Sequence, residues 1–92
     1  MSVFENVPIE EDTNILQQEE KAIGNFRVLW QKWFWDGIKA ESVIFITEEV
    51  VNLSDEDLSD LVRKNIPTRS ATTISRSQSG YTFVNYNFET PG

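Results

Sequence analysis

Four large aromatic side chains lie within one short segment of this chain, and they constrain where its core can form. They are Trp30, Trp33, Phe34 and Trp35. A chain of 92 residues forms one small domain that buries only about 60 to 65% of the surface that the unfolded chain exposes, so each large ring counts. We therefore expect the core, and a contact surface beside it, to form around this segment.

The segment from residue 12 to residue 36 has the apolar spacing of an amphipathic helix. Apolar residues recur three and four positions apart, at Ile15, Ala22, Ile23, Phe26, Leu29, Trp30, Trp33 and Phe34. Two features oppose one helix: Gly24 costs about 1 kcal/mol in a helix interior, and Asp36-Gly37 is a hairpin signal that would join a strand at 26–35 to the next segment. Each face of such a strand would carry both apolar and polar residues, so the alternation expected of a strand is missing. We therefore predict one helix that ends near Gly37.

Three strands and a helical turn are predicted outside this segment. Residues 42–47 form a β-branched and aromatic run typical of a strand buried on both faces, and residues 47–52 fit a helical turn. Residues 81–88 alternate in the manner of a strand. The Ser- and Thr-rich residues 70–77 predict a polar edge strand that pairs with them as a hairpin.

A second helix is predicted from its start signal. Ser54 fits the N-cap, and Asp57 takes the reciprocal position three residues later. The resulting order is α-β-α-β-β, an α+β fold in which helices pack on a three-stranded antiparallel sheet. Residues 12–90 form this single domain, and residues 1–11 form an N-terminal segment that is flexible unless it docks on the domain or on a partner.

The chain contains no histidine and no cysteine, which removes most routes to catalysis and metal binding. Disulfides, thiolate nucleophiles and imidazole bases are excluded, and no Gly-rich phosphate loop or Gly-x-Ser-x-Gly elbow occurs. Solvated carboxylates are the normal occupants of helix N-termini, so the acidic residues do not indicate acid–base catalysis. We expect a protein that is not an enzyme and that uses no cofactor or metal.

We expect no segment that directs the chain to a membrane or a secretory route. The longest apolar run, residues 43–46, is too short to span a bilayer. The first ten residues carry Glu5 and Glu10 but no Lys or Arg, so neither a signal peptide nor a transit peptide is predicted. A cytoplasmic location is the corresponding expectation.

The net charge of −7 is concentrated in one part of the chain. Residues 41–62 contain seven acids and no base, which predicts an acidic surface. We assign that surface to Glu48, Glu49, Asp55, Glu56, Asp57 and Asp60. Such acidity commonly serves solubility and the helix dipole; the alternative is a docking surface that imitates nucleic acid, as in inhibitors and immunity-type proteins. The negative field opposes binding to nucleic acid itself.

One string resembles a nucleic-acid signature. Residues 79–86 read Ser-Gly-Tyr-Thr-Phe-Val-Asn-Tyr and are similar to the RNP1 motif of RNA-recognition motif domains, while residues 44–46 resemble the start of RNP2. The resemblance implies an RNA-binding module in which Tyr81, Phe83 and Phe45 stack on bases. The chain departs from that family in lacking the basic first residue, the second helix and the fourth strand. The other interpretation is that these rings are ordinary strand aromatics covered by the first helix.

The strongest predicted contact surface is the helix face opposite the buried stripe. There Val28 and Trp35 lie seven residues apart, beside Gln31 and Gly24. Tryptophan is common at the centres of interfaces, and a glycine permits close approach of a neighbour. Alternatively the segment bends at Gly24 or is partly a strand, and Trp35 packs inward. We interpret the chain as a non-catalytic protein-binding module, such as an adaptor, assembly factor or inhibitor, whose partner is another protein or a second copy of the chain.

Overall fold

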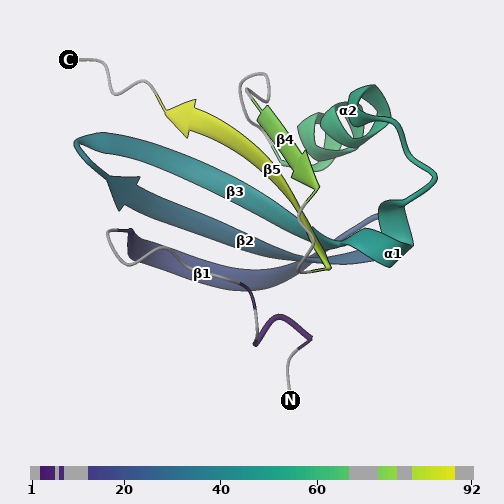
Figure 1. The fold of residues 1–92 in the computed structure, drawn as a ribbon, viewed down its shortest axis with the longest axis horizontal. Coiled ribbons are helices and arrows are strands. Elements are labelled where there is room, and N and C mark those ends of the chain that lie inside the picture. The colour runs from purple at the N-terminus through teal and green to yellow at the C-terminus, as the bar shows by residue number, and fades with distance from the viewer. Residues whose placement is uncertain (1–2, 6, 8–12, 67–72, 77–79, 89–92) are drawn as a thin grey trace.

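The computed structural model describes residues 3–5, 7, 13–66, 73–76 and 80–88, which form one five-stranded antiparallel sheet with two helices (Figure 1). The elements in chain order are β1 (Asn14–Ile23), β2 (Phe26–Trp35), β3 (Ile38–Ile46), α1 (Thr47–Val50), α2 (Asp55–Asn65), β4 (Thr73–Arg76) and β5 (Tyr81–Phe88). Across the sheet the strands follow the order β1-β2-β3-β5-β4, so β1 and β4 are its edges. Among the described residues, no helix has the length and apolar character needed to cross a membrane.

The prediction of a helix over residues 12–36 is wrong, and with it the prediction of a three-stranded sheet. The segment forms β1 and β2, joined by the two-residue turn Gly24-Asn25. A second two-residue turn, Asp36-Gly37, joins β2 to β3. Asp36 and Gly37 have positive φ angles of 49° and 79°, as the type I′ hairpin turn requires. The hairpin signal therefore outweighs the helical spacing.

The helical spacing arises because β2 is buried on both of its faces. Val28, Leu29 and Trp30 are consecutive in the sequence, and all three are buried. Successive strand residues point to opposite faces, so burial on both faces removes the alternation that identifies a strand. β1 has one buried residue, Ile23. β1 has few apolar residues and β2 has many, and together they happen to recur three and four positions apart, as in an amphipathic helix.

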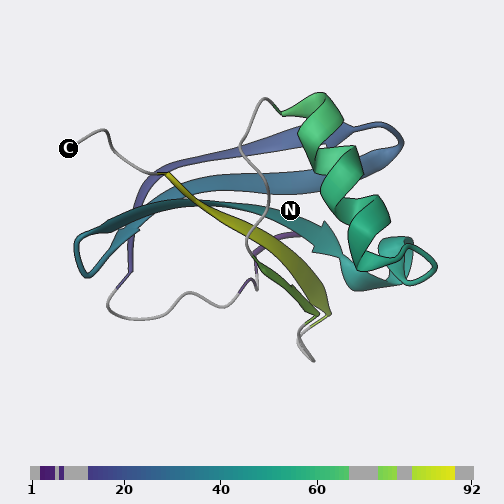
Figure 2. The same cartoon turned by 90° about the horizontal axis from the view of Figure 1, so that it is seen from above.

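Helices α1 and α2 cover one face of the sheet, at the end opposite the β2–β3 turn (Figure 2). Val50 of α1 and Leu58 and Val62 of α2 pack into a cluster of buried side chains. The strand residues in this cluster are Ile23, Val28, Trp30, Val43, Phe45, Val84 and Tyr86. The main core therefore lies between the helices and strands β1, β2, β3 and β5.

The described part of the N-terminal segment packs on the opposite face of the sheet. A second buried cluster consists of Phe4, Val7, Leu29, Ile44 and Tyr81. The hydroxyl of Tyr81 also donates a hydrogen bond of 2.9 Å to the backbone carbonyl of Val3. Of the two outcomes expected for this segment, its described residues show docking on the domain, while residues 8–11 lie outside the described residues.

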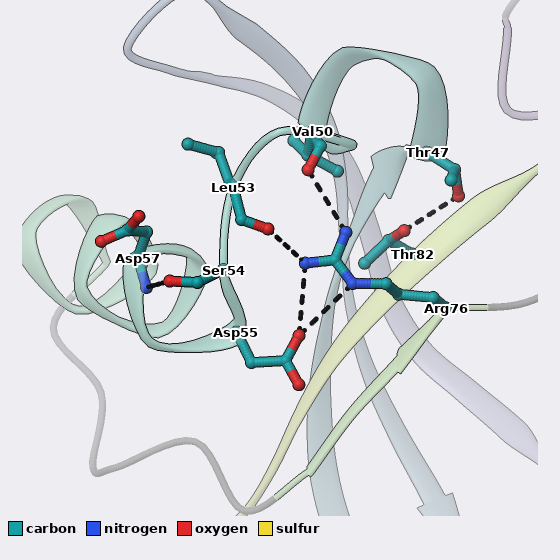
Figure 3. Close-up of polar contacts among 8 residues, drawn as sticks. All are labelled: Thr47, Val50, Leu53, Ser54, Asp55, Asp57, Arg76 and Thr82. Atoms are coloured by element: carbon teal, nitrogen blue, oxygen red, sulfur yellow. Dashed lines mark hydrogen bonds and ion pairs between the residues drawn. The ribbon is translucent and has the colours of Figure 1, made fainter.

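The predicted start of the second helix is confirmed. The Oγ atom of Ser54 accepts a hydrogen bond of 3.1 Å from the backbone N–H of Asp57, and α2 follows directly (Figure 3). Acidic residues occupy the first turn of α2, and Arg63 and Lys64 occupy its last turn, as the helix dipole favours. The start of α2 is therefore determined by residues that are close together in the sequence.

The other predicted strands are confirmed in part of their ranges. Residues 42–46 lie in β3, which begins earlier than predicted because the hairpin with β2 extends it. Residues 81–88 form β5. β4 is a four-residue edge strand inside the range 70–77, and the rest of that range lies outside the described residues. α1 is the helical turn predicted after the central strand.

Candidate functional site

The residues predicted to form one contact face do not share a face. Val28 and Trp35 are seven residues apart, which places them on one side of a helix but on opposite sides of a strand. Val28 is 0% exposed, and Gln31 is buried and donates a hydrogen bond of 2.8 Å to Oε1 of Gln18. Gly24 lies in the β1–β2 turn, and the side chain of Trp35 lies outside what the structure describes. The helix face on which this site was predicted therefore does not exist.

The predicted acidic residues lie on α1 and on the first half of α2. They are Glu48 and Glu49 in α1 and Asp55, Glu56, Asp57 and Asp60 in α2. Two of these carboxylates pair with bases of the same chain. Asp55 lies 3.2 Å from Nη2 of Arg76, and Asp60 lies 3.4 Å from Nη2 of Arg63. The fold therefore places these acids on the two helices and partly neutralises them.

Arg76 of β4 ties the edge of the sheet to the loop between the helices (Figure 3). Its Nη1 donates to the carbonyl oxygen of Val50 at 3.2 Å, and its Nη2 donates to that of Leu53 at 2.6 Å. Its Nε donates to Oδ1 of Asp55 at 3.3 Å. The planar guanidinium satisfies three groups at once, which a lysine could not reproduce. This contact holds α1 and α2 against the sheet.

Two of the three rings that resemble RNA-stacking residues are covered. Phe45 lies in the core beneath the helices, and Tyr81 lies beneath the N-terminal segment with its hydroxyl bonded to Val3. Phe83 is partly buried. An RNA-stacking sheet needs its rings on an open face, and these rings do not form one. Ser79, which stands at the basic position of the motif, lies outside the described residues.

A buried carboxylate that no sequence pattern singled out lies at the centre of a polar cluster. Glu41 is only 3% exposed. Its Oε2 accepts a hydrogen bond of 3.0 Å from Nε1 of Trp30 and another from the hydroxyl of Tyr86, and its Oε1 lies 3.9 Å from Nζ of Lys32. The ammonium groups of Lys21 and Lys32 lie 4.6 and 5.2 Å from the centre of the Trp30 ring. The carboxylate is held by three strands and is not presented to a substrate.

The β2–β3 turn carries the signal that would have identified this cluster. A two-residue turn determines the register of both strands from the turn outward. With Trp35 opposite Ile38, Lys32 stands opposite Glu41. Opposite charges directly across a ladder favour pairing, so a strand interpretation of residues 26–35 would have placed Glu41 beside a base.

Among the residues that the structure describes, β1 pairs with another strand on one side only, and a shallow pocket lies beside it. The strand is ten residues long, pairs with β2 on one side, and contains one buried residue, Ile23. On the face that carries the N-terminal segment lies a pocket of about 260 Å³. It is lined by Phe4, Glu5, Gln18, Glu19, Glu20 and Leu29. Phe4 and Leu29 are buried, whereas Glu5, Gln18, Glu19 and Glu20 are exposed. The side chain of Glu19 faces the other side of the sheet, where its carboxylate lies 4.0 Å from Nζ of Lys21.

Within the described residues, no group of three or more acidic side chains is arranged to hold a metal ion. No protein-family model, curated protein or solved structure matches the chain. In the described part of the chain, the polar groups around Glu41 are paired with one another, whereas the outer edge of β1 and the pocket beside it are accessible.

Proposed function

We propose that this chain is a non-catalytic protein-binding module that pairs an extended segment of its partner with the outer edge of β1. The supporting observation is that β1 is a ten-residue strand at the edge of the described sheet, and that Ile23 is its one buried residue. The outer side of an edge strand presents backbone N–H and C=O groups that can pair with another chain. In such strand addition, the backbone supplies affinity and side-chain pockets supply specificity.

β1 suits this role better than β4, the other edge of the sheet. β4 spans four residues, and its Arg76 is engaged with the loop between α1 and α2. β1 offers a longer ladder, and it contains no proline, the residue that most directly prevents backbone pairing. The longer strand therefore allows a partner segment to form more backbone hydrogen bonds than β4 would.

β1 also carries features that prevent indiscriminate pairing. Charged residues occupy positions 19–21, and the register shifts between Ile15 and Gln17, where Leu16 is exposed. Charges and bulges are the means by which natural edge strands avoid aggregation. They restrict strand addition to a partner of complementary sequence, which is the behaviour expected of a specific binding module.

The chemistry of the chain supports a binding role over a catalytic one. Histidine and cysteine are absent from the sequence, so the usual general bases and thiolate nucleophiles are missing. Among the described residues, the buried carboxylate of Glu41 accepts hydrogen bonds from Trp30 and Tyr86.

A second candidate is a contact made by the acidic residues of α1 and α2. Glu48, Glu49 and Glu56 are exposed, which favours a basic partner at this end of the molecule. Such a contact would weaken steeply as the salt concentration rises, because exposed charges are screened. Strand addition along β1 depends mainly on backbone hydrogen bonds and would respond less to salt.

The test selects peptides from a phage-displayed random library and maps the tightest one on the protein by amide hydrogen exchange. We expect amides of β1 to gain protection when the peptide binds, because pairing closes the outer edge of the strand. Amides of α1 and α2 serve as the internal reference and should not change. If no peptide is enriched, or if the protection is confined to the helices, the proposal is wrong.

A further inference from the structure

The side chains along the outer edge of β1 indicate which residue a partner places beside them, an inference that rests on the proposed function. We infer that the partner is an extended segment with a glutamine or an asparagine directly opposite Gln18. The added amide would continue a row of neutral polar side chains that crosses the sheet and ends at Gln18.

This row of neutral polar side chains runs across all five strands of the sheet. Directly paired residues of an antiparallel sheet project to the same face. Gln31 lies two positions from Leu29, which packs in the cluster that contains Phe4, so the row lies on the face that carries the N-terminal segment. In order of pairing, its members are Gln18, Gln31, Ser42, Asn85 and Thr73.

Side-chain hydrogen bonds join neighbours within the row. Nε2 of Gln31 donates to Oε1 of Gln18 at 2.8 Å, and Oγ of Ser42 donates to Oδ1 of Asn85 at 2.5 Å. The indole Nε1 of Trp33 also donates to Oγ of Ser42, at 2.8 Å. Gln31 and Ser42 are buried. This face of the sheet therefore buries neutral polar side chains by pairing them across strands.

Gln18 is the end of the row at β1. Its Oε1 accepts the hydrogen bond from Gln31, and its NH₂ group is the donor end of the same amide. The side chain is exposed. A strand added to β1 would place one residue directly opposite Gln18, on the same face and with the two Cβ atoms about 5 Å apart. That residue would cover the Gln18 amide and would need to accept its hydrogen bond.

The pocket beside β1 makes this hydrogen bond important. Gln18 lines the pocket together with Phe4 and Leu29, which are both buried. A side chain placed opposite Gln18 would occupy the pocket and displace water from the amide. An N–H group that loses water without gaining an acceptor is destabilising, so the pocket selects for a side chain that supplies one.

The need for an acceptor separates amides from other side chains. An apolar side chain offers none, and lysine and arginine offer donors only. A carboxylate would lie near Glu20, which shares this face with Gln18, and like charges across a ladder are unfavourable. A hydroxyl stops one bond beyond Cβ, whereas Gln18 and Gln31 pair as two long amides. A carboxamide both accepts and donates without charge, so glutamine and asparagine fit.

The register of β1 opposes a second copy of the chain as this partner. Symmetric antiparallel registers centred on residues 19–21 place like charges directly opposite one another. A register centred on Gln18 avoids this, but the irregularity between Ile15 and Gln17 interrupts the ladder one residue from the centre. A segment of another protein has neither restriction.

The test measures binding by isothermal titration calorimetry, using the peptide that the library selects most strongly. Nuclear Overhauser contacts between the peptide and β1 identify the peptide residue opposite Gln18, which we expect to be glutamine or asparagine. Leucine at that peptide position should weaken binding about tenfold, because the Gln18 amide is then covered and unpaired. This change leaves the protein itself unaltered.

A double-mutant cycle tests the pair. Gln18→Leu should weaken binding of the selected peptide about tenfold, and both leucines together should also lose about tenfold, since neither amide then lacks its partner. Gln17→Leu is the matched control, because Gln17 is exposed and projects to the opposite face. It should change the affinity by less than about threefold. Amide spectra establish that each variant is folded, and the peptide change decides alone if Gln18→Leu is not.

Three outcomes overturn the inference. A loss of about a hundredfold for the double change would show that the two amides act independently. An equal loss with Gln17→Leu would show that the effect is not specific to the face of Gln18. Peptides that protect β1 but place another residue type opposite Gln18 overturn the inference and leave strand addition standing, whereas peptides that do not engage β1 overturn both.

Discussion

The indole Nε1 of Trp30 donates a hydrogen bond of 3.0 Å to Oε2 of Glu41, diagonally across β2 and β3. Tyr86 of β5 donates to the same oxygen, so three strands share one buried carboxylate. A buried charge is costly unless its partners are present, and every buried side-chain nitrogen and oxygen in the described residues has one. A one-residue slip would move Glu41 to the other face, so the cluster favours a single register of the sheet.

Removal of the Tyr86 hydroxyl should weaken the fold. Tyr86→Phe deletes one donor and leaves the Glu41 carboxylate buried, so we expect the free energy of unfolding to fall by about 1 to 3 kcal/mol. Glu41→Gln keeps the shape and removes the charge. Because the two groups contact one another, the double variant should lose less than the two single losses together, by at least about 0.5 kcal/mol. Urea unfolding of the four proteins measures this coupling, and additive losses would contradict it.

Loss of the N-cap should destabilise α2. Ser54→Ala removes the acceptor of the Asp57 backbone N–H, so we expect the free energy of unfolding to fall by about 0.5 to 2 kcal/mol. Ser59→Ala is the control, because Ser59 lies inside α2 and alanine is the better helix former there. Thermal or urea unfolding compares the two. A loss of the same size in both variants would count against the cap as the cause.

Arg76 should tolerate lysine poorly. Arg76→Lys keeps the charge but cannot reach the carbonyls of Val50 and Leu53 together with Asp55, so we expect a loss of about 1 to 2 kcal/mol in unfolding free energy. Arg63→Lys makes the same change at an exposed pair on α2 and should cost less than about 0.5 kcal/mol. Equal stability of the two variants would show that the Arg76 contact contributes little.

The β2–β3 turn should be sensitive to the backbone preference of residue 37. An added Cβ at Gly37 would meet no atom within 4 Å, so the effect of Gly37→Ala comes from the backbone φ of 79° alone. We expect Gly37→Ala to cost about 1 to 2 kcal/mol in unfolding free energy. Gly37→Asn should cost less, because asparagine adopts this conformation more readily. An asparagine variant less stable than the alanine variant would contradict the turn assignment.

The elements that could be predicted from the sequence are those whose partners are close along the chain. The cap at Ser54 joins residues three positions apart, and the alternation of residues 81–88 is visible within one strand. The segment that became β1 and β2 could not be assigned in this way, because its apolar spacing fits a helix. Its two turns, at Gly24 and at Asp36-Gly37, held the contrary signal.

The candidate site depended on contacts between distant parts of the chain. The pocket combines Phe4 with Gln18 and Leu29, three segments that no local pattern connects. The surface predicted from Val28 and Trp35 required a helix, and in a strand these two positions face opposite ways. Because the assumed helical period was wrong, two residues of the predicted surface, Val28 and Gln31, are buried in the sheet, and Gly24 lies in a turn.

By itself, the sequence determined the start of α2 at Ser54, the strand character of β3 and β5, the negative net charge and the lack of histidine and cysteine. Only the tertiary structure decided that residues 14–35 form two strands, that Glu41 is buried, and that β1 lies at an edge beside a pocket. The physical reason is distance along the chain. A cap is decided by neighbouring backbone groups, whereas a strand in a sheet is stabilised by hydrogen bonds and burial that other segments supply.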